Sequence, residues 1–184
     1  MTQHALYQWP HPLALYPDRG KKSYRMKRLR YRLRSLLHRQ AIKKFEYFVN
    51  QNASLVPLLN ARPDFSYPLA HRFLDKRFSA KQRLDAMCDN LTFLPEKLTA
   101  LGLPPLWQHA ISFGEVIPDF ELKLMLSEHQ PMEGFWTLEL IHSSSQELVY
   151  LLTFGKVQQA LLIAVIQGPN FEGSKDMVKL LTKK

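Results

Sequence analysis

The residues best suited to chemistry in this 184-residue chain lie near its C-terminal end, in a glycine-bearing loop that leads into an amphipathic helix. The candidates for binding an anion there are Gln167, Gly168, Asn170, Gly173 and Ser174. The first backbone N–H groups of a helix have no partner within the helix and attract phosphate groups. The alternative is an ordinary strand-to-helix connection, in which the glycines only shape the backbone. The P-loop pattern and the glycine pattern of dinucleotide-binding folds are both missing from this loop.

A second candidate site is a basic segment near the N-terminus. The chain has a net charge of +9, and roughly half of its 25 lysines and arginines lie between residues 19 and 44, where there is no Asp or Glu. Apolar residues recur there at three- and four-residue steps, which predicts one helix over residues 23–49. We expect its apolar face to pack against the core through Met26, Leu29, Leu33, Leu36, Leu37, Ala41, Phe45 and Phe48. The opposite, basic face carries Arg25, Arg28, Arg32, Arg39 and Lys43.

Three functions fit such a basic helix. Its charged face can simply be solvated while the helix packs into a core. It can contact an anionic membrane surface or an acidic protein partner, because basic amphipathic helices lie at lipid interfaces. It can also bind nucleic acid non-specifically through phosphate contacts, although the segment lacks the stacking array of aromatic residues that single-strand binding uses.

The elements that must position these residues indicate an α+β fold, with a helical half followed by a sheet half. Residues 79–82, of the form S-x-x-Q, are a capping box that predicts a helix ending near Phe93, before Pro95, with a short helix over residues 95–101. From Phe120 the apolar period changes to two. We expect an antiparallel meander of strands over residues 120–129, 135–142, 148–155 and 161–166.

The last of these strands is a continuous apolar run, which predicts a buried strand. A strand, a loop and a helix then end the chain. We therefore expect an N-terminal arm over residues 1–20 and a single α+β domain over residues 21–184.

Several classes of site and location are not indicated. The seven histidines and the single cysteine, Cys88, are not at ligand spacing, so we expect no metal, and Cys88 fits a helix face in the core. No secretory signal is visible, and no apolar run approaches the roughly 20 residues of a transmembrane helix. We expect a cytoplasmic protein, with peripheral contact at the inner membrane left open.

Two segments resemble the VirK/YbjX family of Gram-negative bacteria, a group labelled as a domain of unknown function. They are residues 72–84 (RFLDKRFSAKQRL) and 163–170 (IAVIQGPN), the second followed by Asp176 and Lys179. The resemblance implies a protein linked to envelope homeostasis, virulence and resistance to antimicrobial peptides, without an established reaction. Members of the family run on into further strands and helices, so we expect this chain to be incomplete at its C-terminus. In that case the strand over residues 161–166 would be a hydrophobic sheet edge without a partner.

The order of helices, strand meander and strand–loop–helix is also similar to the topology of GNAT acyltransferases. In those enzymes the loop after the fourth strand holds the pyrophosphate of acyl-CoA on backbone N–H groups. Of their loop pattern this chain keeps Gln167, whereas Asn170 and Glu172 stand where glycine or alanine is usual, and Pro169 removes one N–H. A GNAT-like acyltransferase or acyl-CoA-binding protein is therefore an alternative, and whether the protein is an enzyme stays open.

Overall fold

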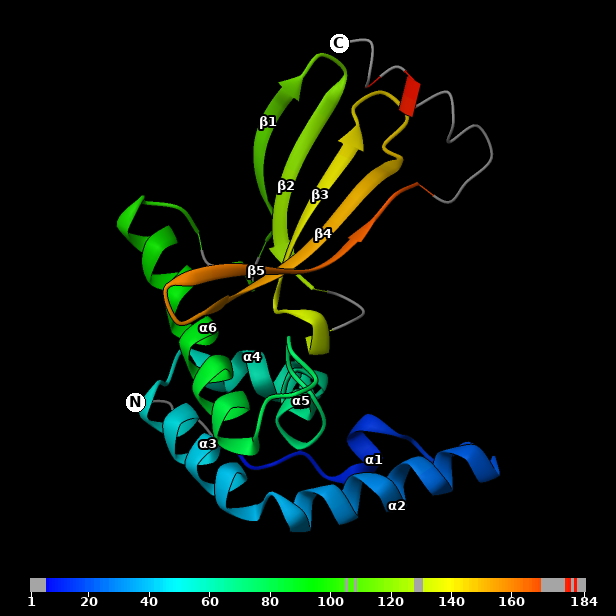
Figure 1. Ribbon diagram of the computed structural model, residues 1–184, viewed down its shortest axis with the longest axis vertical. Helices are drawn as coiled ribbons and strands as arrows, with labels where there is room; N and C mark the ends of the chain where they lie inside the picture. The colour runs from blue at the N-terminus through cyan, green and yellow to red at the C-terminus, as the bar shows by residue number, and fades with distance from the viewer. Residues whose placement is uncertain are drawn as a thin grey trace. The chain divides into compact units, whose positions relative to one another are not determined.

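Helices precede strands along the chain, as the change of apolar period predicts, and the α+β class is confirmed (Figure 1). The computed structural model describes residues 6–104, 106–107, 109–127, 131–169, 178–179 and 181. It divides into two units, Met1–Leu91 and Thr92–Lys184, which are described separately below. The first twenty residues are part of the first unit, and the expected boundary after residue 20 stays a prediction.

The first unit is helical. In order, its elements are α1 (Pro12–Leu15), α2 (Lys22–Leu37), α3 (Arg39–Gln51), α4 (Leu55–Ala61), the 3-10 helix η1 (Pro63–Phe65), α5 (Tyr67–Ala70) and the start of α6 (Ala80–Ala100). Its fully buried side chains include Phe45, Phe65, Leu69, Phe73 and Met87. These come from different helices and a loop, so burial of apolar surface is what holds the short helices together.

The predicted single helix over residues 23–49 is wrong, because the chain leaves the helix at His38, where φ is −105° and ψ is 20°. This break changes which side of the segment is buried. In α3 Phe45 is buried as expected, but the residues buried beside it are Ile42 and Val49, whereas the predicted Ala41 and Phe48 are only half-buried. The predicted apolar residues of α2 are exposed.

Helix α6 begins at the predicted capping box. Ser79 N–H donates to Gln82 Oε1 at 2.9 Å, and Gln82 N–H donates to Ser79 Oγ at 3.3 Å. The predicted stop before Pro95 is wrong, because α6 continues to Ala100 with Pro95 inside it. A proline removes one backbone hydrogen bond and strains the turn before it, but the residues after it can resume helical angles. The helix closes at Gly102, which has a φ of +69°.

The second unit contains a five-stranded antiparallel sheet in which the strands lie in sequence order. The strands are β1 (Ile111–Ile117), β2 (Phe120–Leu126), β3 (Trp136–His142), β4 (Leu148–Val157) and β5 (Ala160–Gln167), with the 3-10 helix η2 (Pro131–Glu133) before β3. The four predicted strands of the meander are confirmed, and β1 was missed. Gly114, with a φ of +72°, lies within the first of two register shifts of β1, between Ser112 and Glu115, and this irregularity breaks the alternation that marks a strand.

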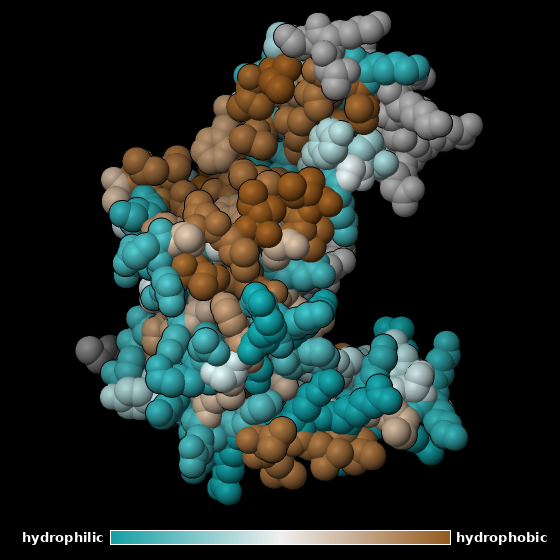
Figure 2. All heavy atoms as spheres, viewed as in Figure 1, coloured by the Kyte–Doolittle hydropathy of each residue, from teal (hydrophilic) through white to brown (hydrophobic). Residues whose placement is uncertain are grey.

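Strand β5 is not buried, contrary to the prediction from its apolar run. Leu161, Ile163 and Ile166 are 61%, 53% and 65% exposed. Among the described residues β5 pairs with β4 alone, so it is an edge strand. Figure 2 shows hydrophobic atoms gathered over β5 and the strands beside it. A continuous apolar run therefore marks a strand correctly here but does not reveal what covers it.

Candidate functional site

Helix α2 contacts the rest of its unit through an aromatic and polar face. Tyr31 is 2% exposed, and its hydroxyl donates to the carbonyl oxygen of Pro10 at 2.9 Å. Its ring stacks on Trp9, with the centroids 6.1 Å apart and the planes at 2°. Burial raises the pKa of the Tyr31 phenol well above its usual range. The N-terminal arm is thus the surface on which α2 rests.

Two arginines of α2 also face inward. Arg28 donates to the carbonyl oxygen of Tyr16 at 3.2 Å and lies 3.5 Å from the carboxylate of Asp18. Arg34 donates to the hydroxyl of Tyr67 at 2.9 Å. Arg28 therefore lies apart from the other four residues of the predicted basic face, because its guanidinium fastens α2 to the arm.

The opposite side of α2 exposes five apolar side chains, which we call the leucine stripe. They are 43% to 78% exposed: Met26, Leu29, Leu33, Leu36 and Leu37. The prediction that this face packs against the core is wrong for α2. A 3.6-residue period shows which residues share a face, but Tyr31 and Arg28 give the other face enough buried contact to take the inner position. Figure 2 shows hydrophobic atoms along the outer side of α2.

Cations border the leucine stripe. Helical geometry places Arg25 and Arg32 along one edge of the stripe and Arg30 along the other. All three are exposed, as are Arg39 and Lys43 on α3. Within the described part of the chain none of these five forms a salt bridge. The result is an exposed apolar band with exposed positive charge on both sides.

A pocket of about 510 Å³ lies beside this surface, between the arm and the α2–α3 segment. Its apolar lining includes Trp9, Pro10 and Leu36, and its charged lining includes Arg32, Arg39, Lys43 and Glu46. A volume of this size is in the range of small-molecule sites. The pocket was not predicted, and the one signal for it in the sequence was the aromatic content of the arm.

The bend between α2 and α3 is held by Arg83 of α6. This buried guanidinium donates to the carbonyl oxygens of Leu69 at 3.0 Å and Phe78 at 2.7 Å. A third nitrogen lies 3.2 Å from His38 Nε2. Since arginine has no acceptor, His38 must accept through Nε2 and stay neutral. Burial, with the charges of Arg83 and Arg34, lowers the pKa of His38 accordingly.

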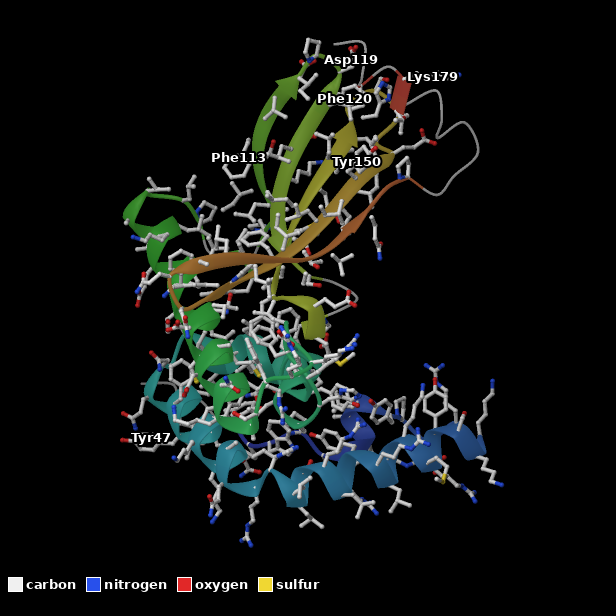
Figure 3. The ribbon with its side chains drawn as sticks, in the orientation of Figure 1. Tyr47, Phe113, Asp119, Phe120, Tyr150 and Lys179 are labelled. Carbon is white, nitrogen blue, oxygen red and sulfur yellow. The ribbon has the colours of Figure 1, made fainter. Side chains whose placement is uncertain are left out.

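The predicted anion loop is described only at its start. Gln167 ends β5 and is exposed, and Gly168 follows it. A Cβ on Gly168 would lie 3.5 Å from the ring of Tyr150, which Figure 3 labels on β4. Asn170, Gly173 and Ser174 lie outside the described residues. Anion binding by this loop, and acyl-CoA as its ligand, stay predictions.

Three further observations concern metal binding, membrane crossing and the reactivity of the cysteine thiol. Within the described residues, no three His, Cys, Asp or Glu side chains group closely enough to hold a metal ion. None of the helices in the described ranges has both the length and the apolar character needed to cross a bilayer. Burial, with the charges of Asp85 and Asp89, raises the pKa of Cys88 to about 12, so this half-buried thiol is a poor nucleophile.

The structure thus defines an α+β protein whose exposed features, among the described residues, include a cationic helix with an outward apolar band and an exposed apolar edge strand. The chain belongs to the family described as "Protein of unknown function (DUF535)", whose profile matches residues 20–184.

Relatives in this family include a protein of Mannheimia haemolytica named "Membrane protein LapB", 68% identical over 97% of this chain and 78% of its own length. An uncharacterized protein of Haemophilus influenzae is 59% identical over all of this chain and 62% of its own length. A second one from that organism is 29% identical, and this chain again spans 62% of it. No solved structure matches the chain.

Proposed function

We propose that this protein docks on an anionic membrane surface through α2. In this arrangement the leucine stripe enters the boundary between headgroups and acyl chains, and Arg25, Arg30 and Arg32 lie at the level of the lipid phosphates. The observation that supports this proposal is the outward orientation of the stripe. If α2 packed as its sequence suggests, its arginines would face solvent, and its leucines would be buried in the core and could not enter a bilayer.

The energies support reversible binding. Full burial of a leucine side chain contributes about 1.5–3 kcal/mol, so each half-exposed leucine of the stripe adds about 1 kcal/mol. A cation near an anionic surface adds about 1 kcal/mol. Five apolar side chains and three arginines together contribute about 8 kcal/mol, close to what a single myristoyl chain contributes, and an anchor of that strength binds membranes reversibly.

The leucine stripe also separates this proposal from the nucleic-acid alternative. Phosphate contacts to a duplex use cations and gain nothing from an apolar band between them. Experiment can distinguish membrane docking from binding to an acidic protein partner, because binding to a protein would not require a bilayer. Docking of this kind places the protein at the inner membrane as a peripheral protein.

Vesicle sedimentation tests the proposal. Full-length protein should pellet with vesicles of phosphatidylglycerol and phosphatidylethanolamine and stay in the supernatant with phosphatidylcholine. Leu29→Ser combined with Leu33→Ser, or Arg25→Glu with Arg32→Glu, should each reduce the bound fraction at least about tenfold. The controls are Leu101→Ser and Lys97→Glu, which make the same kinds of change, one at a time, at exposed residues far along the chain. Equal binding to both kinds of vesicle, or variants that bind like their controls, would refute membrane docking through α2.

We further propose a role in envelope homeostasis, including virulence and resistance to cationic antimicrobial peptides. The resemblance of residues 72–84 and 163–170 to the VirK/YbjX family supports it, as does the name of the Mannheimia relative, which is called a membrane protein. Deleting the gene should increase sensitivity to polymyxin. Restoring the unaltered gene should reverse this, and restoring the Leu29→Ser, Leu33→Ser variant should not. Unchanged sensitivity in the deletion strain would remove this role.

A further inference from the structure

The pocket beside α2 has an apolar wall and a cationic rim. The wall is built on Trp9, whose indole N–H donates to Ser35 Oγ at 3.1 Å and whose ring also packs edge-on against Phe45. These contacts fix the ring, so the wall is formed before any ligand arrives. Pro10 and Leu36 continue it, and Leu36 is 71% exposed.

The charges around this pocket do not cancel. Arg32, Arg39 and Lys43 line it, and Glu46 is the acid among its lining residues. The Glu46 carboxylate already accepts the backbone N–H of Trp9 at 2.7 Å, so it serves to hold the arm in place. Three exposed cations therefore line a pocket whose one acidic lining residue is already hydrogen-bonded to the arm, and this excess of positive charge favours an anionic ligand.

We propose that this pocket binds one molecule of an anionic membrane phospholipid. Its phosphate is held by Arg32, Arg39 and Lys43, and the first part of one acyl chain lies on Trp9, Pro10 and Leu36. This inference rests on the proposed function and deepens it. Leu36 belongs to both the leucine stripe and the pocket, so docking of α2 on the bilayer would place the pocket next to the lipid headgroups.

A test without a bilayer distinguishes the pocket from surface docking. Octyl phosphate, kept below its micelle concentration, should bind the full chain saturably at one molecule per protein in calorimetry. Inorganic phosphate lacks the chain and octyl glucoside lacks the charge, so each should bind at least about tenfold more weakly. Binding by phosphate alone to the same degree would reduce the pocket to an anion site and overturn the lipid assignment.

The chain offers a matched pair of lysines for locating the site. Lys43 lines this pocket, whereas its neighbour Lys44 lines a different hollow with Gln40 and Lys81. Lys43→Gln should weaken octyl phosphate binding about tenfold, as loss of one charge-assisted contact does, and Lys44→Gln should leave it unchanged. Trp9→Phe should abolish the change in tryptophan fluorescence that accompanies binding.

Membrane docking and the phospholipid pocket can fail independently of each other in these experiments. The Leu29→Ser, Leu33→Ser variant should lose vesicle binding and keep octyl phosphate binding, because neither leucine lines the pocket. Vesicle binding without saturable octyl phosphate binding overturns the pocket and leaves membrane docking intact. Equal losses in Lys43→Gln and Lys44→Gln overturn it as well, since they indicate a diffuse charge effect.

Discussion

The orientation of α2 makes a sharp prediction about stability, because Tyr31 and Leu33 stand two residues apart on opposite sides of the helix. Tyr31 is 2% exposed, so Tyr31→Ala removes an aromatic side chain that buries roughly 150–250 Å², or about 4–6 kcal/mol at 25 cal/mol per Å². Measured losses for core aromatic-to-alanine changes are about 3–5 kcal/mol, and we expect this range. Leu33 is 58% exposed, so Leu33→Ala should change the free energy of unfolding by no more than about 0.5 kcal/mol.

Urea unfolding followed by far-UV circular dichroism measures both changes. Tyr31→Phe is the control that keeps the ring and removes the hydroxyl bonded to Pro10, and it should cost about 1 kcal/mol. The reasoning is refuted if Leu33→Ala destabilises the protein as much as Tyr31→Ala does. In that case the leucine stripe is the inner face of α2, and both the membrane proposal and the lipid pocket lose their basis.

Three further perturbations test other parts of the structure. Ser79→Ala removes half of the capping box of α6 and should cost about 1 kcal/mol in urea unfolding, whereas Ser79→Asp should retain most of the stability. The folded-state pKa of His38 lies below its ordinary value of 6.5, so the contribution of neutral His38 to stability is complete above pH 6.5 and is lost as the pH falls below 6.5. His38→Gln can still accept a hydrogen bond from Arg83 but does not titrate, so it should flatten this loss of stability in unfolding curves measured from pH 7 to 5. Gly134→Ala would place a Cβ 2.4 Å from the carbonyl oxygen of Phe154 at a φ of +135°, and we expect thermal unfolding to show a loss of about 2 kcal/mol or more.

The sequence predicted the elements better than their surroundings. The alternation that begins at Phe120 and the continuous apolar run over residues 161–166 marked strands correctly, because both patterns are local to the strand. The Ser79 box marked the start of α6 because its hydrogen bonds are local too. Whether a face is buried depends on contacts with residues far along the chain, and the periodicity of a segment carries no information about those contacts. Thus the apolar faces of α2 and β5 were both expected inside, and both are exposed.

The same limit applies to the candidate sites. Arg28 looked like its neighbours Arg25 and Arg32 in the sequence, and only the position of Tyr16 and Asp18 shows that it faces inward. The pocket could not be predicted, because it arises where Trp9 of the arm meets α2 and α3. For the loop after β5, Gln167 and Gly168 are placed at the strand end, and their proposed ligand stays a prediction.

The sheet has a consequence for how the protein is made. Its strands lie in the order β1-β2-β3-β4-β5, so within the described sheet each strand pairs with strands adjacent in the chain. Such pairing requires closure of short connections, which favours rapid folding over topologies that join distant segments. The strands also leave the ribosome in this order, so each newly synthesised strand meets a partner that is already available.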